Sequence, residues 1–135
     1  MLHAFDVFEN KHWALLRVRP QLILIVRRTG EPYESVEEVH DSFAELEAAL
    51  AEYNRKHFSL LVDLRSAPQR NDPEYEKAAS GEPAALARDF LRVAVLVRTA
   101  AGKLQVGRHI RNSGAKMMPF NDETEALDYL QSRRP

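Results

Sequence analysis

Three apolar runs of the sequence are each followed closely by an arginine, at Arg28, Arg65 and Arg98. If these runs are parallel strands, the three side chains lie at one edge of the sheet, where the ligands of open α/β sheets bind. A guanidinium group recognises carboxylates and phosphates through paired hydrogen bonds. The spacing therefore predicts a site for an anionic or phosphoryl group at this edge.

Other polar residues follow the same runs. Asp63 is the best single candidate for an acid or base, and a salt bridge to Arg98 would explain it equally well. Asp72 stands where a helix should begin, so a helix cap explains it fully, although the free N–H groups of helix starts also attract anions. The hypothetical ligand- or partner-binding set is Arg28, Asp63, Arg65, Arg70, Asn71, Asp72, Arg98 and Thr99.

Several kinds of chemistry are excluded by residues that the chain lacks. It has no cysteine, which excludes disulfides, thiol nucleophiles, iron–sulfur clusters and cysteine-based zinc sites. No two of its five histidines have metal-ligand spacing, and no phosphate-binding loop, dinucleotide fingerprint or serine-nucleophile motif occurs. We therefore expect no metal, no cofactor and no catalytic residues.

The composition is that of one small domain, residues 1–135. The 135 residues are 44% hydrophobic and 29% charged, with a formal net charge of -1. A charge this close to zero gives no general attraction to nucleic acid. The longest aliphatic run, residues 22–26, is too short to cross a membrane, and the first residues lack a signal-peptide pattern. We expect a cytoplasmic protein that binds no nucleic acid and does not insert into membranes.

Hydrophobic periodicity predicts the strands that must position the polar residues. Residues 5–7 alternate between apolar and polar, which is typical of a half-buried strand. Residues 22–26 form an unbroken apolar run, which indicates burial on both faces of a sheet. Strands are expected at residues 5–7, 13–18, 22–26, 60–65, 93–97 and 117–120, and the first two should form an antiparallel edge.

Cap and breaker residues predict about four helices. Ser35 and Glu38 form a capping box before apolar residues spaced by three and four. The Gly-Glu-Pro sequence at residues 81–83 should break or kink the second helix before it resumes over residues 84–89. Helices are expected at residues 36–53, 73–89 and 100–112, and beyond Asn121 or Asp122. Strands followed by helices at this spacing predict a mostly parallel α/β sheet with right-handed crossovers.

Two segments carry a resemblance to a known superfamily. The first runs from residue 61 to residue 74, and the second is RVAVLVRTAAGKLQV at residues 92–106. Together with the order of elements, they resemble uncharacterised bacterial STAS/Sec14-like proteins of the SpoIIAA-like superfamily, which includes anti-sigma-factor antagonists and cytoplasmic domains of sulfate transporters. The resemblance implies one domain with a mixed, mostly parallel sheet of five to six strands and about four helices. It also implies relatives that act mostly by protein–protein contact.

One position departs from the pattern of the superfamily. Anti-sigma-factor antagonists carry a phosphorylatable serine at the start of the helix after the Asp-Leu strand end, where this chain has Asn71, Asp72 and Pro73. Asp72 cannot be phosphorylated as a serine is, which argues against a phosphorylation switch. The Sec14-like branch of the resemblance implies a lipid or apolar ligand, and the small number of helices favours a small one.

The function is open between three hypotheses. The first, which we expect, is a regulatory and non-enzymatic module that binds a protein partner through residues 65–75, the helix after them and the basic face of the 100–112 helix; a homodimer is a compatible assembly. The second is a binder of a small anion, nucleotide or apolar ligand at the carboxyl edge of the sheet. The third is an enzyme with Asp63 or Asp72 as acid or base, for which no converging residues speak.

Overall fold

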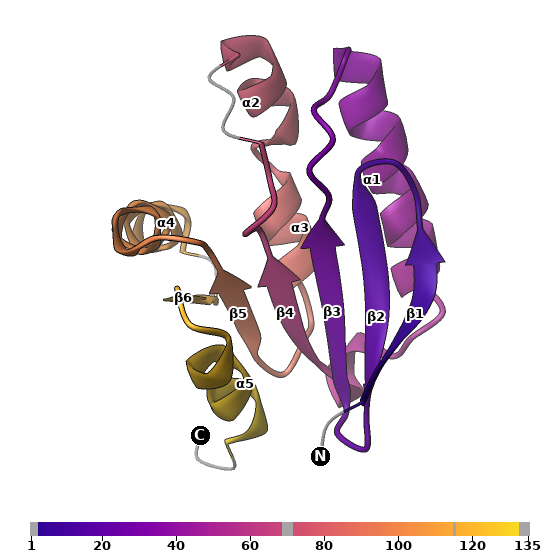
Figure 1. Ribbon diagram of the computed structural model, residues 1–135, viewed down its shortest axis with the longest axis vertical. Coiled ribbons are helices and arrows are strands. Elements are labelled where there is room, and N and C mark those ends of the chain that lie inside the picture. The colour runs from indigo at the N-terminus through magenta and orange to yellow at the C-terminus, as the bar shows by residue number, and fades with distance from the viewer. Residues whose placement is uncertain (1–2, 69–71, 115, 133–135) are drawn as a thin grey trace.

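A six-stranded sheet in the order β1-β2-β3-β4-β5-β6 forms the centre of the chain (Figure 1). The computed structural model describes residues 3–68, 72–114 and 116–132. The first three strands pair antiparallel, and β3 to β6 pair parallel, which confirms the predicted mixed sheet with its antiparallel edge. The strands are β1 (His3–Glu9), β2 (Trp13–Arg19), β3 (Ile23–Arg28), β4 (Ser59–Asp63), β5 (Val93–Leu96) and β6 (Met118–Phe120).

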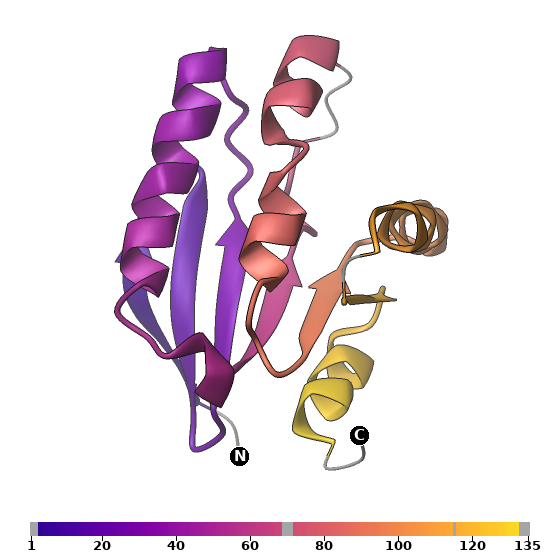
Figure 2. The same ribbon diagram turned by 180° about the vertical axis from the view of Figure 1, so that it is seen from behind.

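The central strands are buried on both faces, because their apolar runs leave no polar side to turn toward water. Every residue of β4 and β5 is buried. Strands of this kind need cover on both sides of the sheet. Figures 1 and 2 show that α1 (Val36–Leu50) and α3 (Glu82–Ala87) cover one face and α5 (Glu123–Gln131) the other.

Side-chain alternation along the strands divides the hydrophobic core into two clusters. Leu24 and Val26 of β3 belong to the cluster beneath α1 and α3. Ile23 and Ile25, from the same strand, belong to the cluster that includes residues of α5. Successive side chains of a strand point to opposite faces, so a single apolar run contributes to both layers.

The first helix begins as its capping box predicts. The Ser35 hydroxyl accepts a hydrogen bond from the Glu38 amide at 3.0 Å, which satisfies one of the free N–H groups of the first turn. The helix ends at Leu50, earlier than the apolar stripe indicates. Tyr53 lies in the turn that follows and still packs edge-to-face on Phe58, with ring centroids 5.5 Å apart. A short 3-10 helix, Arg55–His57, joins this turn to β4.

The predicted break at residues 81–83 is confirmed, and it separates α2 (Pro73–Ala79) from α3. The helix resumes at Glu82 rather than at residue 84, because proline is well tolerated in a first turn. It ends at Ala87 rather than at residue 89, where Asp89 has a φ of 71°. The described residues therefore contain five α-helices where about four were predicted. Within these residues, no helix is both long and apolar enough to cross a membrane.

The helix α4 (Ala100–Ser113) lies at the edge of the molecule beside β5 and β6, and it is seen end-on in Figure 1. Thr99 caps its start, and Gly114, with a left-handed φ of 71°, caps its end. Among the residues of α4 whose burial the structure describes, only Gly107 is buried. A Cβ atom at Gly107 would lie 3.7 Å from Cγ of Pro119, so α4 rests closely on β6 at this point.

Leu46 tests the packing of α1 on the sheet. It is fully buried in the cluster beneath α1 and α3. We expect Leu46→Ala to lower the free energy of unfolding by about 2–5 kcal/mol, since the change removes buried methyl groups and leaves a cavity. Denaturation in urea measures the effect. The exposed Asp41→Ala on the same helix should change stability by less than about 0.5 kcal/mol, and similar losses in the two variants would contradict this packing.

Candidate functional site

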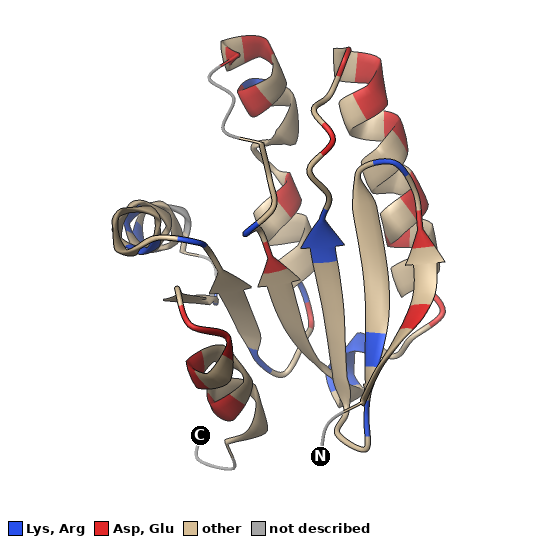
Figure 3. Ribbon diagram, viewed as in Figure 1, with Lys and Arg blue, Asp and Glu red and all other residues tan. Residues whose placement is uncertain are grey.

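At the carboxyl ends of β3 and β4, residues that are adjacent in sequence face opposite sides of the sheet. Arg27 is the register partner of Asp63, and the two side chains lie on the α5 side. Arg28, the next residue, lies on the other side, where it is buried against Trp13 and Tyr33. Figure 3 shows the basic end of β3 beside the acidic end of β4. The three strands therefore end along one edge of the sheet, as predicted, but Arg28, Arg65 and Arg98 do not form one site.

Asp63 is the centre of an ion-pair cluster on the α5 side. The residue is 2% exposed, and its carboxylate accepts hydrogen bonds from Nε of Arg27 at 3.1 Å, from Nε and Nη2 of Arg65 at 3.0 and 2.9 Å, and from the Arg65 amide at 3.1 Å. Arg65 also pairs with Glu123 of α5 at 3.5 Å. The cluster therefore ties the ends of β3 and β4 to α5.

The protonation of Asp63 follows from these contacts. Burial by itself raises the pKa of the Asp63 carboxyl, but the hydrogen bonds from Arg65 and Arg27 outweigh burial and hold this pKa below its ordinary value. The partner is not Arg98, which is exposed and forms no ion pair with the described residues. A carboxylate held in this way is a structural anion rather than an available acid or base.

The remaining residues of the predicted binding set are helix caps or lie outside the described residues. Asp72 caps α2 and accepts a hydrogen bond from the Glu74 amide at 3.0 Å. Thr99 caps α4 and accepts one from the Gly102 amide at 3.0 Å. Arg70 and Asn71 lie outside the described residues. The structure thus gives the two cap residues the ordinary role that their positions indicate, and it brings neither into contact with Asp63.

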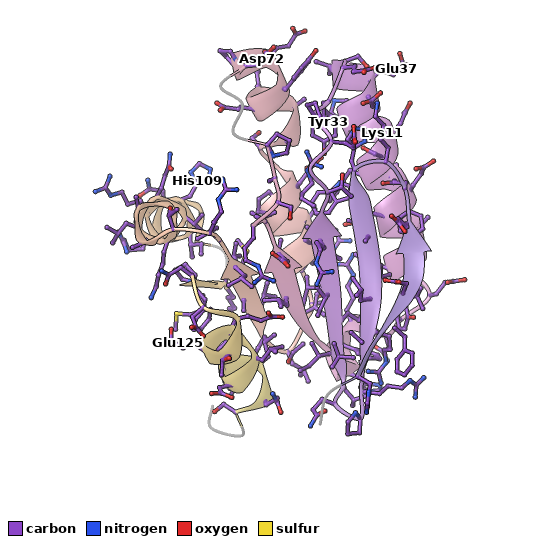
Figure 4. All side chains as sticks on the ribbon, viewed as in Figure 1. Lys11, Tyr33, Glu37, Asp72, His109 and Glu125 are labelled. Carbon is purple, nitrogen blue, oxygen red and sulfur yellow. The ribbon has the colours of Figure 1, made fainter. Side chains whose placement is uncertain are left out.

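A cleft of about 550 Å³ opens between α3 and α4, against the strand ends of β4 and β5. It exists because α4 rests on β6 instead of closing over the sheet, so apolar side chains of both helices and both strands face a common space. Figure 4 shows Tyr33 by the connection from β3 to α1 and His109 on α4, two residues that line this cleft. Its apolar lining includes Val62, Val95, Leu86, Val106 and Ile110.

Arg28 lies at one end of the cleft. Its guanidinium group donates to the backbone carbonyls of His12 at 2.8 Å, Thr29 at 3.3 Å and Glu31 at 3.3 Å. It also lies over the Tyr33 ring, 4.6 Å from the centroid. With 7% of its surface exposed, it forms no ion pair with a carboxylate of the described residues. Arg28 is therefore a buried cation held by neutral groups.

Glu82, at the first position of α3, lines the same end of the cleft. Burial raises the pKa of its carboxyl to about 7, and the positive charge of Arg28 acts against this increase. Within the described residues its carboxyl forms no hydrogen bond and no ion pair. Near neutral pH this group therefore exchanges between a neutral and a charged form, which distinguishes it from Asp63.

Sequence reasoning missed Glu82, Tyr33 and the cleft itself. The signal for the two faces is present in the sequence, because alternation places Arg27 and Arg28 on opposite sides of a strand. In the sequence, Glu82 is recognisable only as part of the helix break at residues 81–83. The cleft has no signature of its own, since it depends on where α4 packs.

A shallow hollow of about 320 Å³, lined mostly by polar residues, lies between the start of α1 and the β1–β2 turn. Nε2 of His12 lies 2.8 Å from a carboxylate oxygen of Glu38, and Lys11 approaches the same carboxylate at 3.6 Å. The described residues contain no cluster of three side chains that could hold a metal ion. These contacts join the β1–β2 turn to α1 and do not form a candidate site.

The structural role of Asp63 can be measured. We expect Asp63→Asn to lower the free energy of unfolding at neutral pH by about 1–3 kcal/mol, because charge-assisted hydrogen bonds to two arginines are lost. Denaturation in urea measures the loss, because urea is uncharged and does not screen the ion pairs as guanidinium chloride would. The matched change Asp128→Asn, at an exposed position of α5, should be nearly neutral. An equal loss in the two variants would remove the basis for the cluster.

The raised pKa of Glu82 predicts a pH dependence of stability. The folded state binds the proton more tightly than the unfolded state, so stability falls as pH rises from the ordinary pKa of 4.5 to about 7 and is constant above this value. Glu82→Gln lacks this loss. Between about pH 5 and pH 8 the variant should gain up to about 3 kcal/mol relative to the wild type. Urea denaturation of both proteins measures the difference, and a difference independent of pH would contradict the burial of Glu82.

Comparison with known proteins bears on the fold. No family model matches the chain, and no curated protein sequence does. A crystal structure of an uncharacterised protein of the DUF3478 family from Shewanella loihica PV-4, described as having a SpoIIAA-like fold, is similar with a TM-score of 0.55 and 16% sequence identity. The match covers 96% of this chain and 93% of that chain. The fold of the chain is therefore SpoIIAA-like, which confirms the fold that the resemblance of its sequence implies.

Proposed function

We propose that the chain is a non-enzymatic binding module that holds a small, largely apolar molecule in the cleft between α3 and α4. The single observation that carries this proposal is the cleft of about 550 Å³ with mostly apolar walls and a buried cation at one end. Binding sites for small molecules are typically hollows of about 300–1,000 Å³ with such walls and a few converging polar groups.

The ligand is expected in this cleft rather than at the exposed strand ends. At the strand ends Arg65 already pairs with Asp63 and Glu123, and Arg98 is exposed to water, where an ion pair with a ligand contributes little. The cleft offers apolar surface that gains free energy when it leaves water. Catalysis is not part of the proposal, because Asp63, the best candidate for an acid or base, is held in ion pairs.

A regulatory protein-interaction role is the second candidate, and the outer face of α4 favours it. Leu104 is 66% exposed there and lies beside Lys103, Arg108 and Arg111, a combination that fits an acidic partner with an apolar contact point. A partner bound in this way would contact the outer face of α4, whereas the small molecule would contact its inner face. Variants on the two faces of one helix therefore distinguish the two functions.

N-phenyl-1-naphthylamine, a neutral apolar fluorophore, tests the cleft directly. Its emission rises in apolar surroundings, so we expect a saturable signal from one site. Val106→Trp places a large side chain in the cleft and should raise the dissociation constant at least about tenfold, which is about 1.4 kcal/mol. Leu104→Trp, on the outer face of the same helix, is the matched control and should bind as the wild type does. No saturable signal, or equal affinity in both variants, would count against the proposal.

A further inference from the structure

We propose that the ligand of the cleft is an apolar acid, a hydrocarbon chain ending in a carboxylate, and that Arg28 and Glu82 bind its acidic end. This inference rests on the proposed function of the cleft and adds the chemical class of its ligand. Both residues line the cleft, and their charges interact.

The buried guanidinium of Arg28 supplies the first argument. An arginine has five N–H donors, and the three hydrogen bonds to the carbonyls of His12, Thr29 and Glu31 leave two of the five for another acceptor. The three acceptors are neutral, and no carboxylate of the described residues pairs with the group. A buried cation is stable only when an anion or enough polar groups compensate it. An entering carboxylate supplies both the missing charge and the missing acceptors.

The walls of the cleft supply the second argument. Val62, Val95, Leu86 and Val106 surround the space with carbon from two strands and two helices. A small inorganic anion would leave this surface in contact with water, and a purely apolar molecule would leave Arg28 without a carboxylate in hydrogen-bond contact. A molecule with a hydrocarbon chain and one carboxylate satisfies both parts of the cleft.

Glu82 makes the binding depend on pH. Four ionisable residues line the cleft in the described part of the chain, Arg28 on β3, Tyr33 in the loop after it, Glu82 on α3 and His109 on α4. When charged, Glu82 repels a carboxylate at Arg28; when protonated, it can donate a hydrogen bond to that carboxylate. Because burial raises the pKa of Glu82 to about 7, both forms are present near neutrality. At about pH 7 and above, an acid therefore binds together with a proton.

Calorimetric titration with octanoate and with 1-octanol separates the acid from the chain. At about pH 6 octanoate should bind at least about tenfold more tightly than 1-octanol, the ratio expected for one charge-assisted hydrogen bond. From about pH 6 to pH 8 the affinity for octanoate should fall about tenfold, because the protonated fraction of Glu82 falls by that factor. The affinity for 1-octanol should change little, because an alcohol has no charge for Glu82 to repel.

Variants assign these effects to residues. Glu82→Gln should bind octanoate with the same affinity at both pH values. Arg28→Gln should reduce the affinity for octanoate to that for 1-octanol, and retained binding of 1-octanol shows that the variant still folds. His109→Gln is the control for the pH dependence. Its affinity for octanoate should still fall about tenfold from about pH 6 to pH 8, because Glu82 is intact.

The outcomes separate this inference from the function on which it rests. Equal binding of octanoate and 1-octanol by the wild type would overturn the acid and leave the apolar cleft as a binding site. Loss of the pH dependence in His109→Gln rather than in Glu82→Gln would overturn the role of Glu82. Failure of octanoate, 1-octanol and N-phenyl-1-naphthylamine alike to bind would overturn the proposed function as well.

Discussion

The structure depends on the parallel pairing of β3 and β4, two strands buried on both faces whose neighbouring side chains point to opposite sides. This alternation requires helices on both sides of the sheet, and it assigns each polar residue at the strand ends to one side. Arg27 and Arg28 are adjacent in sequence and lie in different environments for this reason. Arg27 belongs to the ion pairs around Asp63, and Arg28 belongs to the cleft between α3 and α4.

The two sides use charge in different ways. Around Asp63, the partly exposed side chains of Arg27 and Arg65 neutralise a buried carboxylate and donate hydrogen bonds to it. Around Arg28, a buried cation is held by carbonyl groups and aromatic rings. The first arrangement is complete within the chain. The second has unused hydrogen-bonding capacity, and it adjoins the apolar cleft between α3 and α4.

Local rules in the sequence predicted the elements well, because their signals are local. The capping box at Ser35, the break before Pro83 and the apolar run at residues 22–26 each depend on neighbouring residues only. The SpoIIAA-like fold was implied by the resemblance of residues 61–74 and 92–106 to that superfamily, together with the order of the elements. The apolar runs also predict the edge at which the strands end, whereas the face of each arginine depends on the alternation that separates Arg27 from Arg28.

The candidate site was harder to predict because it depends on tertiary packing. Val106 and Ile110 look like ordinary inward positions of an amphipathic helix, and nothing near them in sequence indicates that they face an open space. That space arises where α4 rests on β6 through Gly107 and Pro119. Glu82 occupies an ordinary first position of a helix, and its unusual environment comes from strands and a loop that are distant in sequence.

The close contact of Gly107 with Pro119 has a consequence for the dynamics of the molecule. A helix whose described side chains include no large buried residue can separate from the sheet without exposing much apolar surface. Its opening then costs less free energy than global unfolding, so its amide hydrogens exchange with solvent through local opening while those of β3 and β4 exchange only when the whole domain unfolds. The α4 wall of the cleft is thus less stable than the strands behind it, and a molecule that contacted both α3 and α4 would hold this helix against the core.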